Sequence, residues 1–399
     1  MMRRARVAIA AVFLCDGLLL GSWASRIPAA QAHTGLTNSR LGLALFASSF
    51  GALVAMPVAG WLSARIGSRR VSVAGLLTAA FAIAGTSQAS GLVSLASALF
   101  MFGAGFGSVN VAANAQGIAL ERLYGRSILS SFHAAFSLGG LLGAGSGALM
   151  AAISVAPRAH FASVLIVVAT ATLAARRNLL TRDIDAAHMQ RTLVRPPRVL
   201  LALGIAAFCT LLAEGAAADW SAAFLTQSVG VTGGVAGLGY TAFSLAMVAS
   251  RTLGDELTRR VGAVTLARAG GAIAASGLAA GLLIASAPIA LLGFAAMGLG
   301  LGVIVPVLFR AAGSTPGVTA SVGVAAVSTI GWLGFLAGPP SIGFVAGGIG
   351  LRWALAIVVV VTGALTFLAG AAAQRTRREP RALRLAAGAA GRLGHRPCS

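Results

Sequence analysis

Residues 199–224 read VLLALGIAAFCTLLAEGAAADWSAAF, a run of 26 residues in which only Glu214 and Asp219 are charged. A helix needs about 20 mostly apolar residues to cross the hydrocarbon core of a bilayer. Comparable runs recur along all 399 residues, and the chain is 57% hydrophobic and 10% charged, with a mean hydropathy of +0.89. Soluble domains carry about 25% charged residues. The composition therefore excludes an ordinary water-soluble enzyme and predicts a polytopic membrane protein.

The apolar runs predict twelve membrane helices, because a span and its loop together take about 30 residues. The first run resembles a secretory signal peptide, but eleven similar runs follow it, so we expect a membrane helix there as well. The expected spans are 7–26, 41–63, 71–89, 92–117, 130–153, 160–175, 199–224, 235–252, 264–285, 288–310, 320–345 and 352–373.

The basic residues predict the topology. All 30 are arginine, against 9 acidic residues, which gives a net charge of +21. Such an excess can indicate nucleic-acid binding, but twelve spans place 26 arginines on one side and only Arg26, Arg40, Arg158 and Arg352 on the other. The positive-inside rule then predicts that both termini are cytoplasmic. We therefore expect anionic lipids at the cytoplasmic face as partners, and no nucleic acid.

These spans divide the chain into four parts. Residues 1–175 are expected to form an N-terminal six-helix bundle and residues 199–373 a C-terminal one. Residues 176–198, which are rich in arginine and contain Pro196 and Pro197, are expected to be a cytoplasmic linker. Residues 374–399 are expected to form a basic, disordered cytoplasmic tail.

An internal repeat relates the two bundles. Nine glycines of the first half recur as glycines 195 positions later, whereas chance predicts about three such coincidences. Two parallel six-helix repeats are an architecture of secondary transporters. The paired positions are 35/230, 42/237, 67/262, 75/270, 103/298, 105/300, 107/302, 139/334 and 143/338.

The stretch between the second and third spans resembles the loop motif of the major facilitator superfamily. Its glycines and arginines are Gly60, Arg65, Gly67, Arg69 and Arg70, and the second half echoes it with Arg251, Asp255, Arg259, Arg260 and Gly262. The resemblance implies that these are gating loops. Ser63 stands where the superfamily usually has an acidic residue, which puts the latching of the first loop in question.

Four further stretches, 21–28, 131–140, 214–221 and 334–340, resemble the MosC-like (YbjJ-like) group, which is related to the fucose permeases. This resemblance implies a monomeric secondary transporter of the bacterial inner membrane that works by alternating access on a small polar organic solute. The proline-containing span-5 motif of drug/proton antiporters is missing, since residues 139–145 contain no proline, and this weakens an exporter interpretation.

Charged residues inside spans are the first candidates for function, because burying one costs about 2.5–3.5 kcal/mol even on the lenient scales. Asp16 lies near the middle of the first span and Glu214 within its repeat partner, the seventh. We interpret both as proton-coupling groups, and for Asp16 a role as a hydrogen-bond acceptor for the substrate is an alternative. The alternative is a structural carboxylate bonded to a neighbouring helix. His133 is a further candidate for proton relay, although a lone histidine is more often structural.

Polar side chains in the fourth and seventh spans are candidates for binding the solute. Asn110 and Asn114 share one helix face with Gly103, Gly107 and Gly117, and their amides both donate and accept hydrogen bonds, or else join helices to one another. Three more candidates are Trp23, Asp219 and Trp220. For the two tryptophans a place in the interfacial belt or a gate is an alternative to stacking on a sugar.

The sequence analysis thus predicts an all-α membrane protein with two parallel six-helix repeats, and a secondary transporter for a sugar or cyclitol-like solute that is coupled to protons. The alternatives are proton-antiport efflux of an amphipathic compound and a non-transporting membrane sensor. No catalytic triad, phosphate-binding loop or metal-ligand spacing is evident, so we expect neither an enzyme nor a cofactor or metal.

Overall fold

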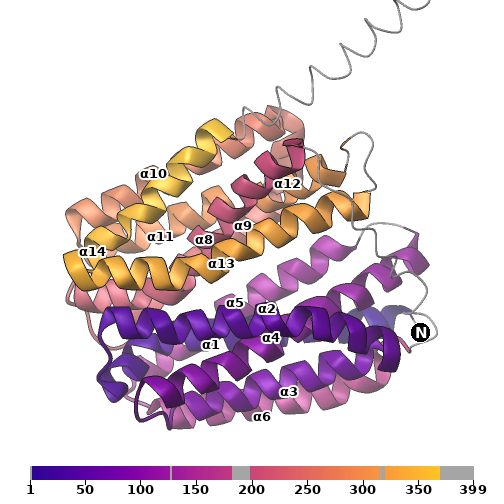
Figure 1. Cartoon of the computed structure of the whole chain (residues 1–399), viewed down its shortest axis with the longest axis horizontal. Coiled ribbons are helices and arrows are strands. Elements are labelled where there is room, and N and C mark those ends of the chain that lie inside the picture. The colour runs from indigo at the N-terminus through magenta and orange to yellow at the C-terminus, as the bar shows by residue number, and fades with distance from the viewer. Residues whose placement is uncertain (1, 126–127, 182–197, 314, 316–319, 369–399) are drawn as a thin grey trace, which may run out of the picture.

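The computed structural model describes residues 2–125, 128–181, 198–313, 315 and 320–368. Its regular structure within these ranges is entirely helical (Figure 1). The expected all-α fold is therefore confirmed. Parts of two expected segments, 182–197 of the linker and 369–399 with the tail, lie outside the described residues.

The helices of the first half are α1 (Met2–Thr34), α2 (Asn38–Ile66), α3 (Ser68–Thr86), α4 (Leu92–Tyr124), α5 (Leu129–Ala152) and α6 (Pro157–Ala175), followed by the 3₁₀ turn η1 (Arg176–Asn178). Those of the second half are α8 (Arg198–Gln227), α9 (Gly234–Val261), α10 (Ala263–Ile284), α11 (Ala287–Leu301), α12 (Ile304–Gly313), α13 (Ala320–Ile349) and α14 (Leu351–Ala354), and residues 356–368 are helical too. Each of the twelve expected spans coincides with one of these helices or with an adjoining pair.

Ten segments within the described ranges are long and apolar enough to cross a membrane. The two remaining expected spans correspond to α3 and α9. Arg69 and Arg70 lie in the first turn of α3, and the last eleven residues of α9 contain five charged residues. With 19 and 28 residues, both helices are long enough to span a membrane. Their charged ends lower the mean hydropathy of each helix, although the rest of it is apolar.

One expected span is interrupted. The range 288–310 is two helices, because α11 ends at Leu301 and α12 begins at Ile304. Pro306 explains the break: it has no backbone N–H to donate to the carbonyl of Gly302, and its ring clashes with that carbonyl. The expected span is nevertheless present as one apolar segment, Ala287–Gly313, whose helix is interrupted at residues 302 and 303.

Helix packing repeats between the halves. The pairs α1/α5, α2/α4 and α3/α4 of the first half correspond to α8/α13, α9/α11 and α10/α11 of the second. Individual contacts repeat as well: a Cβ built on Gly103 would overlap the carbonyl oxygen of Ser48, and one built on Gly298 would overlap that of Phe243. Both residues of the second pair lie 195 positions after those of the first. Close approach of helix backbones therefore explains why these glycines recur.

We predict that Gly103→Ala destabilises the protein by about 1–3 kcal/mol, because the added methyl group forces α4 away from α2. Gly85→Ala, on α3, is the matched control, since a Cβ built on Gly85 would have no atom within 4 Å. Thermal unfolding of the purified variants measures the difference. Equal unfolding temperatures for the two variants would contradict the prediction.

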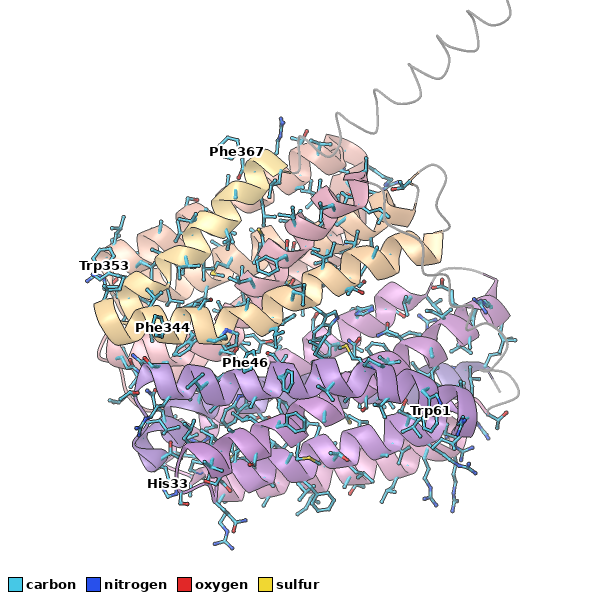
Figure 2. All side chains as sticks on the ribbon, in the orientation of Figure 1. His33, Phe46, Trp61, Phe344, Trp353 and Phe367 are labelled. Carbon is cyan, nitrogen blue, oxygen red and sulfur yellow. The ribbon has the colours of Figure 1, made fainter. Side chains whose placement is uncertain are left out.

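The molecule has two ends, which we name from the chain. The linker end contains the α2–α3, α4–α5 and α9–α10 connections and residues 179–181, and the distal end contains residues 35–37, 87–91, 153–156, 228–233 and 350. Trp61 lies toward the linker end and Trp353 at the distal end (Figure 2). Both are about half exposed and each has an arginine, Arg65 or Arg352, over its ring. This arrangement is typical of aromatic belts at the two membrane–water interfaces.

Apolar side chains cover the outside of the bundle between these two ends. Phe344 and Phe367 are 79% and 78% exposed, and both project from the helical surface (Figure 2). Apolar surface of this extent is unfavourable in water but matches the acyl chains of a bilayer.

Candidate functional site

A small cavity lies between α1, α4 and α5 in the first half. Its volume is about 50 Å³, and its lining residues are Phe13, Asp16, Val109, Asn110, Ala113, His133 and Phe136. Asp16, Asn110 and His133 were each singled out from the sequence, and the fold brings these three polar residues from three helices to one place. A cavity of this size accommodates a few water molecules. A sugar-sized solute therefore requires the surrounding helices to move.

Asp16 is the most isolated polar group in this cavity. Its side chain is 3% exposed, and its Oδ1 has no hydrogen-bond partner among the described residues. The ring of Phe13 lies one turn away on the same helix and packs edge-on against the imidazole of His133, with 5.4 Å between ring centroids. An ionised carboxylate without hydrogen-bond donors is unfavourable in such surroundings, which makes Asp16 a candidate for function.

A second ionic centre lies in the other half, where an oxygen of Glu214 on α8 is 3.7 Å from an Nη atom of Arg251 on α9. At this distance the contact is an ion pair rather than a hydrogen bond. The other oxygen, Oε1 of Glu214, has no partner among the residues described. The side chains of Glu214 and Arg251 are only 15% and 20% exposed, so their attraction is weakly screened by solvent.

Arg251 also joins the two halves. Its Nη1 donates a hydrogen bond of 2.5 Å to Oγ of Ser137 on α5, and this hydroxyl in turn donates to the backbone carbonyl of His133. The guanidinium thus connects Glu214 to the helix that lines the cavity of the first half. A fixed, planar cation with several donors is suited to such a double contact.

The resemblance to the loop motif implied that Arg251 lies in the second gating loop, but the structure places it inside helix α9. Arg251 lies within α9, eleven residues before Gly262, which is about 16 Å along a helix. Its ionic partner was not foreseen. Arg251 is, however, the one basic residue within the apolar part of α9, and the apolar part of α8 contains two acidic residues, Glu214 and Asp219, so opposite charge could have suggested a pair between the two helices.

Tyr240 was missed by the sequence analysis. It is 6% exposed and shares a hydrogen bond with Ser244, and it lies within electrostatic reach of Glu214, Asp219 and Arg251. Its hydroxyl oxygen is 3.8 Å from a Cβ built on Gly140 of α5, so it too lies at the junction of the halves. Asp219, a predicted binding residue, therefore lies near this group rather than on the cavity of the first half.

The other predicted binding residues do not line the cavity. The amide of Asn114 donates to the carbonyl of Asn110 on its own helix, at 2.7 Å. Trp23 and Trp220 are 2% and 0% exposed, and Trp23 packs against Phe161 of α6 with 6.5 Å between ring centroids. An interfacial-belt position for these two tryptophans was wrong, because both are buried inside their bundles.

The face of α4 that carries Asn110, Asn114 and the three glycines contacts two different helices. Gly103 and Gly107 lie against α2, whereas a Cβ built on Gly117 would meet Leu129 and Phe132 of α5. Since helices cross at an angle, one face of a long helix meets different neighbours along its length.

The first predicted gating loop lies at the linker end. Gly60 is buried and Gly67, which joins α2 to α3, has a φ of +89°, a conformation that favours glycine. Arg65 and Arg70 are exposed and Arg69 is half-buried. Ser63 is 6% exposed, and its hydroxyl has no partner among the described residues.

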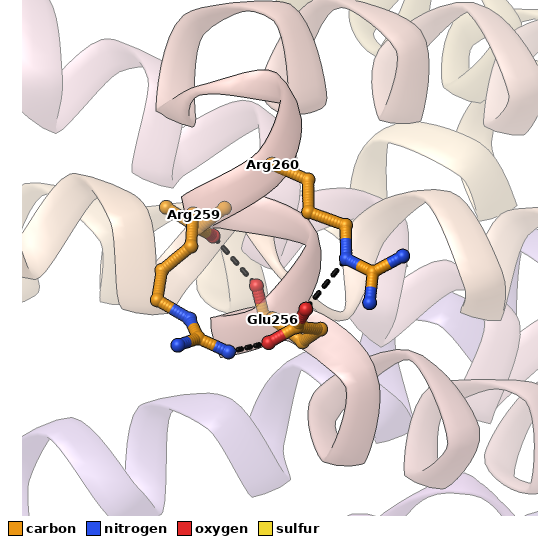
Figure 3. Close-up of polar contacts among 5 residues, drawn as sticks. Glu256, Arg259 and Arg260 are labelled. Atoms are coloured by element: carbon orange, nitrogen blue, oxygen red, sulfur yellow. Dashed lines mark hydrogen bonds and ion pairs between the residues drawn. The ribbon is translucent and has the colours of Figure 1, made fainter.

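In the corresponding segment of the second half, at the end of α9, Glu256 pairs with two arginines. It forms ion pairs with Arg259, three residues later, and with Arg260, four residues later (Figure 3). The side chain of the predicted Asp255 lies outside the described residues. Because both arginine side chains are more than 70% exposed, these pairs contribute little to stability.

The two halves meet closely at the distal end. Gln227 at the end of α8 exchanges side-chain hydrogen bonds of 2.9–3.0 Å with Gln31 and Asn38 of the first half. Ser39 also donates to the carbonyl of Gly343 on α13, at 3.2 Å. A Cβ on Gly234 of α9 would lie 2.5 Å from the carbonyl oxygen of Ala148 on α5. Amide hydrogen bonds and backbone contact therefore close this end of the molecule.

We predict that Gln227→Ala weakens the distal closure, because it removes three hydrogen bonds between the halves. The measurement is the rate at which an impermeant maleimide, applied from the distal side, labels a cysteine introduced at Asn110 after the native cysteines are replaced by serine. The rate should rise several-fold. Gln88→Ala, at an exposed position of the same end, should leave it unchanged, and equal rates in both variants would contradict the prediction.

A multi-pass helical bundle with an internal repeat and buried ionic groups at the junction of its halves defines the class of membrane transporters. No family model matches the chain. It is 34% identical over 341 residues to an uncharacterised MFS-type transporter of Yersinia pestis. The aligned residues cover 86% of this chain and 88% of that protein. It is 33% identical over 358 residues to the membrane protein MosC of Rhizobium meliloti, with coverage of 89% and 86%. The chain belongs to the major facilitator superfamily.

Solved structures support the same fold. The nucleoside transporter NupG matches with a TM-score of 0.70 at 12% identity, over 92% of this chain and 98% of that one. A bacterial homologue of the human lysosomal transporter Spinster, inward-facing and occupied, matches with a TM-score of 0.70 at 16% identity, over 92% and 96%. The prediction of a major facilitator fold is therefore confirmed.

Proposed function

We propose that this MFS-type transporter moves a small polar organic solute, such as a sugar or a cyclitol, together with protons by alternating access. The observation that carries the proposal is the convergence of Asp16, Asn110 and His133 on one cavity. Asn110 supplies an amide that donates and accepts, as a polyol requires, and Asp16 supplies a carboxyl group that can exchange a proton.

Arg251 links this cavity to Glu214 in the second half, and we assign it the role of coupling the halves. In the ion pair, Glu214 is an anion. When Glu214 takes up a proton, the attraction is lost and the guanidinium is freed from it. Its contact with Ser137 on the other half then becomes its main polar restraint. Protonation of Glu214 thereby alters a contact that bridges the moving parts.

The topology belongs to the same proposal. With both termini in the cytoplasm of a bacterium and the chain in the inner membrane, the distal end faces outward, and its closure corresponds to an inward-facing state. In that state the solute exchanges with the cytoplasm, and for import we propose that it is released there. Protons enter by the same alternation, driven by the gradient across the membrane.

Uptake into proteoliposomes tests the proposal. Radiolabelled sugars and cyclitols are presented outside vesicles that contain the purified protein, with an inward proton gradient. The expected result is accumulation of at least one of these solutes, which a protonophore abolishes. Absence of gradient-driven uptake across the panel, together with drug resistance of cells that overexpress the protein, would overturn it in favour of efflux.

A further inference from the structure

A second polar cluster lies at the distal end of the first half, apart from the cavity. It consists of Ser25 and Arg26 on α1 and His160 on α6. Arg26 is 4% exposed and His160 is 2% exposed. Arg26 lies ten residues after Asp16, which is about 15 Å along a helix, so the two sites are distinct.

This cluster has more hydrogen-bond donors than acceptors. One Nη of Arg26 donates to the backbone carbonyl of Val155. The Nε of Arg26 and both ring nitrogens of His160 have no partner in the described part of the chain. A guanidinium is charged at every relevant pH, and a buried donor without an acceptor is unfavourable.

Among the described residues of either half, no carboxylate forms an ion pair with Arg26. Asp16 and Glu121 are the only acidic residues before residue 176. Asp16 belongs to the cavity, and Glu121 accepts hydrogen bonds from the backbone of residues 128 and 129 at the linker end. A buried cation in such surroundings requires a counter-ion from elsewhere.

The packing places Ser25 and His160 side by side. A Cβ built on Gly147 of α5 would overlap Oγ of Ser25 and lie 3.2 Å from Cε1 of His160, so both side chains converge on this glycine. Arg26 lies within electrostatic reach of His160. On the other side of Ser25 is Gly237 of α9, and a Cβ built on this glycine would lie 3.2 Å from Cβ of Ser25. The cluster is therefore part of the closed junction between the halves.

We propose that Arg26 and His160 bind one small inorganic anion, chloride, and that the bound anion stabilises the closed distal end. A water molecule would satisfy the donors but would leave the charge of Arg26 unbalanced. A halide accepts hydrogen bonds from every direction, and it supplies the negative charge that the described side chains around Arg26 do not.

Thermal unfolding of the full-length protein in detergent tests the site. At constant ionic strength, replacing sodium gluconate by sodium chloride should raise the unfolding temperature by about 3 °C, saturably, as for any ligand that binds only the folded state. Bromide should act likewise. Arg26→Gln and His160→Asn should abolish the rise, and Arg158→Gln, at an exposed arginine on the same helix as His160, should retain it.

Either of two results would overturn the proposal. One is equal unfolding temperatures of the unaltered protein in gluconate and chloride, which requires no variant to fold. The other is an undiminished chloride response in Arg26→Gln or His160→Asn. The unfolding temperature can be measured without any transported solute. A negative result for the anion site therefore does not contradict the proposed transport function, and the reverse is also true.

Discussion

Asp16→Asn should eliminate gradient-driven accumulation of the solute while leaving solute exchange close to the rate of the unaltered protein. Symport of one proton lets a gradient of one pH unit concentrate a neutral solute about tenfold, since 1.4 kcal/mol corresponds to a factor of ten. Asparagine retains the size and hydrogen bonding of the acid but carries no exchangeable charge. The accumulation ratio should therefore fall to about 1.

Proteoliposomes separate the two processes. Net uptake is driven by an imposed proton gradient, and counterflow of labelled against unlabelled solute is measured without one. Glu379→Gln, which removes a carboxylate from the segment expected to be the cytoplasmic tail, is the control and should preserve both activities. Accumulation by Asp16→Asn equal to that of the unaltered protein would contradict the assignment of Asp16 to coupling.

Arg251→Gln should lower transport at least tenfold and destabilise the protein by about 1–3 kcal/mol. The substitution leaves the carboxylate of Glu214, whose side chain is 15% exposed, without its cation, and it removes the hydrogen bond to Ser137. Removing one partner of a buried ion pair is more costly than removing both. The double variant Glu214→Gln with Arg251→Gln should therefore regain much of the stability but not the transport.

A double-mutant cycle on unfolding temperatures measures this coupling, and interaction energies above about 0.5 kcal/mol are expected for residues in contact. Arg260→Gln is the control, because its side chain is 73% exposed and exposed ion pairs contribute little. Additive effects of the two single substitutions would show that the pair is not an energetic unit.

The helical architecture could be predicted from the sequence because each part of it depends on local patterns. A membrane span needs only an apolar run of sufficient length, and the glycine repeat marks close helix approaches that recur in both halves, as at Gly103 and Gly298. The break near Gly302 could not be located by hydropathy. It depends on the single N–H that Pro306 lacks rather than on the apolar character of the segment.

The candidate site was predicted residue by residue but not as an assembly. Asp16, Asn110 and His133 stood out because polar groups are costly in spans, yet only the rotation of α1, α4 and α5 about their axes brings the three together. The pairing of Arg251 with Glu214 depends on the packing of α8 against α9. The amide cluster of Gln31, Asn38 and Gln227 involves residues of ordinary polarity near helix ends, and nothing in composition distinguishes them.

The segment that follows α6 is attached to α4 by a single buried glutamine. Gln116 is fully buried; its amide nitrogen donates to Oγ of Ser68 and to the carbonyl of Leu180, and its oxygen accepts from the backbone N–H of Leu180. Asn110 lies six residues before Gln116 on the same helix, about 9 Å away. One helix, α4, therefore holds both the backbone at Leu180 and the amide of Asn110, so a displacement of α4 along its axis moves both.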